Sequence, residues 1–223
     1  MIAALAGPLR RRARHGALGM SPRTVLALVV ASVGALAMFA WPLLLNPPEG
    51  YSHTSDAPFV FALSLPVLVV IVLAEMTSDG MDTKALAMLG VLSAIGAALR
   101  PLGAGTGGVE LVFFLLVLGG RVYGPAFGFV LGSTTLFTSA VLTGGMGPWL
   151  PFQMLASSWV GMGAGLLPRV RGRAEIALLA AYAFLSAYAY GFLINLWGWP
   201  FGIVGPDTQL SYLPGAAVLE NLH

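Results

Sequence analysis

Residues 24–46 read TVLALVVASVGALAMFAWPLLLN and contain no charged side chain. A helix needs about 20 mostly apolar residues to cross the roughly 30 Å hydrocarbon core of a bilayer. A secretory signal peptide has a shorter apolar region, of roughly 7–15 residues, followed by a small-residue cleavage site. This run is longer and ends at Asn46-Pro47-Pro48, so we expect a retained transmembrane helix.

The composition of the whole chain agrees with this interpretation of one segment. Of its 223 residues, 57% are apolar and 9% are charged, and the mean hydropathy is +0.86. A surface that faces water carries roughly 25–35% charged residues, so 9% cannot coat a soluble globule. This composition excludes a soluble enzyme, a disordered tail and a nucleic-acid-binding protein. We expect an all-α integral membrane protein surrounded by the lipid bilayer.

Further apolar segments follow the first, separated by short polar or glycine-rich turns. We expect a polar loop over residues 49–56, a helix end at Arg100-Pro101 and a tight turn over residues 121–125. Residues 1–23, rich in arginine, should form a basic cytosolic leader, and residues 24–82 should form two additional N-terminal transmembrane helices. The whole pattern predicts a helical bundle of about seven transmembrane helices, over residues 24–46, 58–76, 84–99, 109–120, 126–143, 151–167 and 174–197.

The positions of the few charges predict the orientation in the membrane. If the amino terminus is cytosolic and the spans alternate, every one of the 11 Lys and Arg residues except Arg100 falls on the cytosolic side. Cytosolic loops of membrane proteins carry an excess of Lys and Arg. We therefore expect a multi-pass protein of the cell membrane with a cytosolic amino terminus.

Several kinds of chemistry lack the residues that they need. The chain has no cysteine, and its histidines, His15, His53 and His223, lie outside the predicted spans. Its lysine, Lys84, does not complete the G-x-x-x-x-G-K-[ST] phosphate loop of ATPases. We expect no catalytic site, no metal site and no cofactor, so this chain should not be an enzyme.

Carboxylates deep inside a span mark ion or substrate pathways. Glu75, Glu110 and Glu175 all lie near predicted span ends, which favours ordinary interfacial carboxylates and argues against ion coupling. Glu110 differs from the others because it follows the glycine-rich turn at residues 103–108 on the outer side. It can therefore face an outer cavity.

Small residues recur at a spacing of four along three predicted helices, and such stripes let helix backbones approach closely in a membrane. Two interpretations stay open, which are packing inside this chain and a docking surface for another membrane protein. The stripes are Gly90, Ala94 and Ala98; Gly124, Gly128 and Gly132; and Gly161 and Gly165.

Two clusters of aromatic and amide residues fall on the outer side of the predicted topology. Ligand pockets are mostly apolar with a few placed polar groups, and residues 144–154 and 195–201 have that composition. The alternative is an interfacial belt, which also enriches tryptophan. We expect one outward-open binding cavity, with these candidate substrate-binding residues: Glu110, Phe114, Trp149, Gln153, Met154, Asn195, Trp197 and Trp199.

From about Lys84 onward the chain resembles the substrate-specific S components of energy-coupling factor (ECF) transporters. The resemblance rests on GGRVYGPAFG at residues 119–128, GPWLPFQM at residues 147–154 and NLW at residues 195–197, together with the small-residue helix that precedes them. It implies a six-helix membrane protein with both termini cytosolic, which binds a vitamin on the outer side. It also implies docking on a transmembrane T component and two ATPase subunits, followed by toppling in the membrane to release the vitamin inside.

The resemblance also assigns a partner surface and a ligand class. The first helix of the family carries an A-x-x-x-A face that touches the T component, and the matching face here is Gly90, Ala94 and Ala98. Residues 147–154 look most like S components for cobalamin, while riboflavin or another aromatic vitamin remains an alternative. We expect residues 83–223 to form the S-component domain, with its sixth helix after Pro214 cut short by truncation.

Two other functional classes remain as alternatives. A self-sufficient secondary transporter needs a coupling-ion site and usually internal repeats, and the sequence shows neither. A membrane scaffold or assembly protein would need the small-residue stripes but not the outer aromatic and amide residues.

Overall fold

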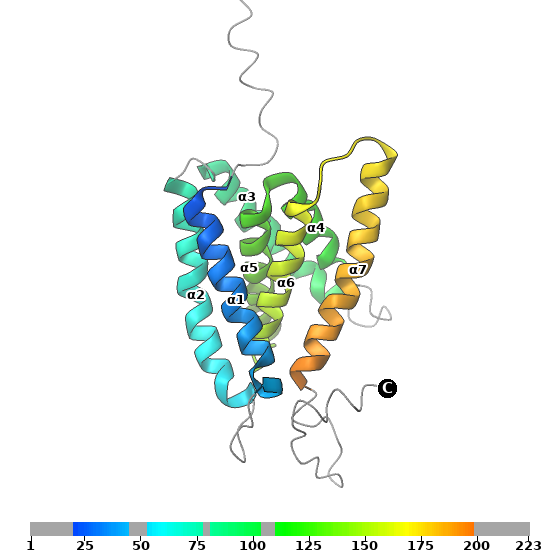
Figure 1. Cartoon of the computed structure of the whole chain (residues 1–223). Coiled ribbons are helices and arrows are strands. Elements are labelled where there is room, and N and C mark those ends of the chain that lie inside the picture. Colours follow the sequence, from blue (N-terminus) through cyan, green and yellow to red (C-terminus); the bar gives the residue numbers. More distant parts are fainter. Residues whose placement is uncertain (1–19, 45–52, 78–80, 104–109, 199–223) are drawn as a thin grey trace, which may run out of the picture.

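The computed structural model describes residues 20–44, 53–77, 81–103 and 110–198, and these parts contain seven α-helices and no strand (Figure 1). The all-α membrane bundle expected from the sequence is confirmed. The expected leader at residues 1–23 and the expected sixth family helix lie wholly or mostly outside the described residues. The helices are α1 (Pro22–Leu44), α2 (His53–Thr77), α3 (Thr83–Gly103), α4 (Val112–Tyr123), α5 (Pro125–Thr143), α6 (Leu150–Leu166) and α7 (Arg173–Gly198).

Five of the described helices, α1, α2, α3, α5 and α7, are long and apolar enough to cross a membrane. The other two, α4 and α6, have 12 and 17 residues. Because α4 rises only about 18 Å at 1.5 Å per residue, it covers only part of the bilayer core. The short fourth segment expected from the sequence is therefore confirmed.

Three expected boundaries were wrong. Helix α2 begins at His53, inside the predicted polar loop, because polar residues extend its first turns beyond the apolar run. Helix α3 continues past Arg100-Pro101 to Gly103, because a proline removes its own backbone hydrogen bond but need not end a helix in a membrane. The predicted turn over residues 121–125 narrows to Gly124, whose φ of 101° is accessible to glycine and strained for other residues.

Local chemistry explains where several helices begin. The Asp82 carboxylate Oδ1 accepts the Ala85 N–H at 2.8 Å and so caps α3. The Ser21 hydroxyl accepts the Thr24 N–H at 3.1 Å at the start of α1. Helix α5 begins with Pro125 directly after Gly124, because proline lacks the N–H that would be unsatisfied at this position.

Helices α5 and α6 form the centre of the bundle, while α1 and α2 lie side by side on one flank and α7 stands at the other (Figure 1). Of the spanning window of α5, 67% is buried inside the protein, compared with 6% for α7. Helix α1 is tied to α6 by the Trp159 indole N–H, which donates to the Ser32 hydroxyl at 3.1 Å. It is also tied by an edge-to-face contact between Phe39 and Phe152, with ring centroids 5.0 Å apart.

The glycines of α4, α5 and α6 bring three backbones into direct contact. A Cβ atom added to Gly120 or to Gly128 would overlap the carbonyl oxygen of Gly161, and one added to Gly161 would overlap that of Gly128. One turn further along, a Cβ on Gly132 would lie 2.5 Å from the backbone of Ser157. For the stripes on α5 and α6, the internal-packing interpretation therefore holds.

The small-residue stripe of α3 has the opposite environment. Gly90, Ala94 and Ala98 are all exposed, and a Cβ on Gly90 would meet nothing within 4 Å. The small residues that this helix buries are different ones, namely Ala85, Ser93, Gly96 and Ala97. The same spacing therefore serves internal packing in α6 and forms an open surface in α3.

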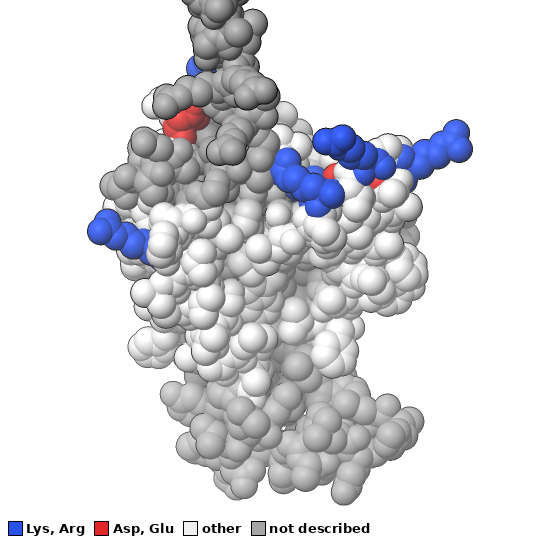
Figure 2. Space-filling model, turned by 45° about the horizontal axis from the view of Figure 1, so that its top comes forward, with Lys and Arg blue, Asp and Glu red and all other residues white. Residues whose placement is uncertain are grey.

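Most of the basic residues in the described parts gather at one end of the bundle (Figure 2). Helices alternate in direction, so the starts of α1, α3 and α7 and the ends of α4 and α6 share this end (Figure 1). Arg100 lies at the opposite end, where it contacts residues at the starts of α4 and α6. The basic end contains Arg23, Lys84, Arg121, Arg169, Arg171 and Arg173.

Candidate functional site

Three polar side chains meet at the end of the bundle opposite the basic residues, and we call Arg100, Glu110 and Gln153 the polar cluster. The Arg100 guanidinium donates from Nη2 to the Gln153 amide oxygen at 3.0 Å. Its Nε lies 4.0 Å from Glu110 Oε2, a distance typical of a loose ion pair. The cluster joins the end of α3, the start of α4 and the first turn of α6, so it links elements that are far apart in the sequence.

An aromatic pair extends this cluster toward α7. The rings of Phe113 on α4 and Tyr190 on α7 meet edge to face, with centroids 4.8 Å apart and an interplanar angle of 69°. Phe113 lies in the first turn of α4, three residues after Glu110, so this contact brings Tyr190 to the same end of α4 as the polar cluster.

Ser157 lies one helical turn beyond Gln153 on α6, close to the Tyr190 phenol. Its hydroxyl is fully buried and makes no hydrogen bond within the described part of the chain. A buried polar group without a partner costs about 1–3 kcal/mol, and the Tyr190 phenol is a polar group close enough to interact with this hydroxyl. Thr135 on α5 supplies a second buried hydroxyl of the same kind.

A cavity of about 350 Å³ lies between α6 and α7, and its lining on α7 extends from Tyr182 to Leu193 and includes Tyr190. Its walls are mostly apolar, with hydroxyls from Tyr182 and Ser186. Ligand sites of roughly 300–1,000 Å³ with apolar walls and a few polar groups are typical of small-molecule binding. The polar cluster, Tyr190 and this cavity together form the candidate site.

The candidate residues named from the sequence fall into different surroundings. Glu110 and Gln153 are brought together through Arg100. The Phe114 side chain is 63% exposed on the surface of the bundle, and Met154 is fully buried in the core. The structure brings neither of them to the polar cluster.

The remaining candidates lie at or near the same end of the bundle. Trp149 is 41% exposed at the start of α6, where its ring lies over Gly147. Asn195 is exposed near the end of α7. Trp197 belongs to α7, but its side chain lies outside the described part, as does the whole of Trp199.

Sequence reasoning missed Arg100 and Tyr190 as site residues. Arg100 served only to fix the topology, although it was the single basic residue expected on the outer side and Glu110 lies just across the glycine-rich turn. That isolated pair of opposite charges was the available signal. No signal in the sequence pointed to Tyr190, because the approach of this residue to α4 depends on how α7 packs against the bundle.

The opposite end of the bundle holds a second charged group, which we call the Arg121 clamp. The Arg121 guanidinium donates to both carboxylate oxygens of Glu175, at 2.7 and 2.8 Å. It also donates to the carbonyl oxygens of Leu167 at 2.6 Å and Pro168 at 3.0 Å. Arg121 is 8% exposed, and these internal acceptors use its donors, so the clamp joins α4, α6 and α7 and is not a ligand site.

Comparison with known proteins gives one family. Residues 84–219, more than half of the chain, match the family model described as "ECF transporter, substrate-specific component". No curated protein and no solved structure matches this chain. The match begins at α3, so α1 and α2 lie in front of it.

Proposed function

Because this chain belongs to the family of ECF transporter substrate-specific components, we propose that it is the vitamin-binding subunit of an ATP-driven importer. It captures the vitamin at the extracellular face of the cell membrane and delivers it through a T component and two ATPase subunits. It carries out no catalysis itself. The amino terminus is cytosolic in this proposal, because the basic end of the bundle then faces the cytosol in accordance with the positive-inside rule.

The observation that carries this proposal is the meeting of Arg100, Glu110 and Gln153 beside Tyr190 and the cavity between α6 and α7. In the proposed orientation the polar cluster lies at the extracellular end of the bundle, and the cavity lies deeper, between the middle parts of α6 and α7. An amide and a guanidinium supply hydrogen bonds of fixed direction, and the Tyr190 and Phe113 rings supply flat apolar contact area. The buried Ser157 hydroxyl lies beside the Tyr190 phenol and adds a further polar group to this part of the site.

Two vitamins are candidates for the ligand. The resemblance of residues 147–154 to S components for cobalamin supports a corrinoid. The cavity enclosed by the described residues, at about 350 Å³, lies near the lower end of the range for drug-sized ligands. Its size favours the alternative, riboflavin or another aromatic vitamin of that size.

The docking surface for the T component is the exposed stripe of Gly90, Ala94 and Ala98 on α3. Helix pairs in membranes associate through small residues that allow close backbone approach, and this stripe has no partner among the described helices that would use it. Both the A-x-x-x-A spacing and the exposure support this assignment.

Mass spectrometry of the small molecules released from the purified full chain tests the binding role. We expect a vitamin to be retained, and incubation with cobalamin and with riboflavin in parallel identifies which. Replacing Gln153 with Met removes the amide, and the loss of about 0.5–1.5 kcal/mol for a neutral hydrogen bond corresponds to roughly 2–10-fold weaker binding. Absence of any retained vitamin from the intact chain would overturn the binding role.

A matched pair of variants separates binding from folding. Arg100→Met removes the guanidinium from the polar cluster, whereas Arg169→Met makes the same change at an exposed residue of the basic end. We expect only Arg100→Met to weaken ligand binding. Equal binding by both variants, or by Gln153→Met and the unmodified chain, favours a scaffold that does not use this site.

Co-purification with a T component tests the docking surface. We expect Ala94→Leu to prevent association, because the larger side chain holds the two backbones apart, while ligand binding is kept. The control is Ala187→Leu, which makes the same change at an exposed position of α7. Uptake into vesicles without ATP or any partner would instead identify a self-sufficient secondary transporter.

A further inference from the structure

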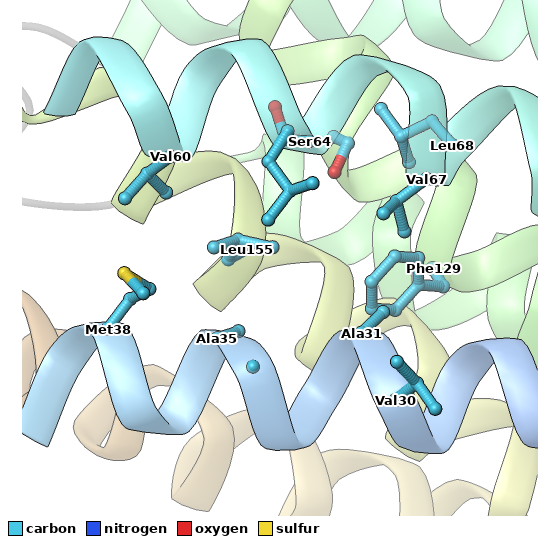
Figure 3. Close-up of a pocket in the computed structure, with 13 residues that line it drawn as sticks. Val30, Ala31, Ala35, Met38, Val60, Ser64, Val67, Leu68, Phe129 and Leu155 are labelled. Carbon is cyan, nitrogen blue, oxygen red and sulfur yellow. The ribbon is translucent and has the colours of Figure 1, made fainter. Parts of the chain in front are cut away.

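A second cavity lies on the other flank of the bundle, between α1 and α2, with the core helices α5 and α6 behind it in Figure 3. It encloses about 220 Å³. Small residues of α1, Ala31, Gly34 and Ala35, line one side, and Val67 of α2 lies opposite. A Cβ added to Gly34 would meet nothing within 4 Å, so this glycine borders open space.

The polar groups of this cavity are already satisfied. The Ser64 hydroxyl donates to the Phe61 carbonyl of its own helix at 2.8 Å. Ser133, 1% exposed, exchanges a hydrogen bond of 2.5 Å with the Ser158 hydroxyl. Burying a polar ligand group without a hydrogen-bond partner is unfavourable. Both lining hydroxyls are already engaged with protein groups and the rest of the lining is apolar, so the chemistry favours a hydrocarbon.

The mouth of the cavity faces sideways, toward the lipid, at a depth within the apolar spans of α1 and α2. Val30 and Leu63 border it and are each 62% exposed, whereas Phe129 at the floor is 1% exposed. Val30 lies within the apolar span Pro22–Ala40, and Leu63 lies within Ala57–Ala74. The mouth is therefore continuous with the lipid-facing surfaces of α1 and α2, at a depth where the surrounding medium is acyl chains.

We propose that this cavity is a binding site for one acyl chain of a membrane phospholipid, inserted sideways between α1 and α2. An apolar cavity of about 150 Å³ holds a benzene molecule, so 220 Å³ accommodates a longer hydrocarbon segment. The site lies where α1 and α2 meet α5 and α6, and an inserted chain fills the space that these helices leave. Its head group stays outside the cavity, in the bilayer interface.

Photolabelling of the full chain in phospholipid vesicles tests this site directly. The probe is a phosphatidylcholine with a diazirine at the middle of one acyl chain, and peptide mass spectrometry maps the labelled residues. Ordinary bilayer lipid reaches the exposed Val30 and Leu63 but not the buried Phe129 and Leu155. We therefore expect label on Phe129 or Leu155, and label confined to exposed lipid-facing residues would overturn the proposal.

Filling the cavity supplies the second arm of the test. Gly34→Leu places a side chain in the open space, and we expect label at the floor to fall at least about fivefold. Gly191→Leu, a glycine of α7 that also has open space around it, should leave the label unchanged. A third measurement needs no variant and uses the unmodified protein with a second lipid probe, whose diazirine lies beside the head group. This second probe should not label Phe129 or Leu155 at the floor of the cavity. Floor label that persists in Gly34→Leu, or that appears equally with both probes, would contradict an acyl-chain site.

Discussion

The close contact of Gly161 with α5 gives the sharpest stability prediction. In Gly161→Ala, the new methyl carbon would lie 2.7 Å from the Gly128 carbonyl carbon and 3.0 Å from its Cα. Carbon atoms in contact prefer separations of roughly 3.5–4.0 Å, so α5 and α6 must move apart by about 0.5–1 Å. The neighbours are backbone atoms, which cannot rotate away as a flexible side chain would.

The size of the effect follows from two opposing contributions. Overpacking of this kind costs typically about 1–3 kcal/mol. Alanine in place of glycine returns up to about 1 kcal/mol through its higher helix propensity. The net expected loss is up to about 2 kcal/mol relative to the unmodified chain, which for a chain of this size lowers the unfolding temperature by up to roughly 8 °C.

The assay is thermal unfolding in detergent, followed by tryptophan fluorescence, with Gly90→Ala as the matched control. Gly90 is also helical, but its Cβ would meet nothing within 4 Å, so only the favourable propensity contribution remains. We expect Gly90→Ala to unfold at an equal or slightly higher temperature than the unmodified chain. If Gly161→Ala proves as stable as Gly90→Ala, direct backbone contact between α5 and α6 is refuted.

Two further predictions concern how the outer helices are held. Arg121→Met leaves the Glu175 carboxylate and two carbonyls without the guanidinium that donates to them. Because hydrogen bonds from a charged donor are stronger than neutral ones, we expect loosening of α7 and a lower unfolding temperature. Arg169→Met is the exposed control, and an equal effect of both would contradict the clamp. Trp159→Phe keeps an aromatic ring but removes the hydrogen bond to Ser32, and we expect a loss of about 0.5–1.5 kcal/mol. That loss appears as weaker disulfide trapping between cysteines introduced into α1 and α6 of this cysteine-free chain, and Ser32→Ala should reproduce it without adding to it.

The spans could be predicted because a bilayer requires long apolar runs, and such runs are visible in sequence alone. Helix ends were harder, as α2 shows by starting inside a polar segment that looked like a loop. The turn between α4 and α5 depended on a single residue, Gly124, whose positive φ lets one helix end and the next begin without a loop.

The candidate site was only partly predictable, because it depends on which faces of the helices meet. Glu110 and Gln153 were identified by residue type and by their place at the outer ends of spans. Their link through Arg100, and the approach of Tyr190 from α7, are contacts across the bundle that no spacing rule reveals. The small-residue stripes show the same limit, since Gly161 and Gly90 have similar local patterns and opposite surroundings.

The Arg121 clamp gives α7 the mechanical character of a lever. This helix has 26 residues and little buried surface, and its strongest described attachment is the ionic one at its first turn. At 1.5 Å per residue it is about 39 Å long, so a tilt of about 10° around that fulcrum would swing the far end by about 7 Å. The cavity between α6 and α7 lies along the middle of this helix, from Tyr182 to Leu193, so a small rotation at the basic end would separate the two helices increasingly toward the other end, with the anchoring charges left in place.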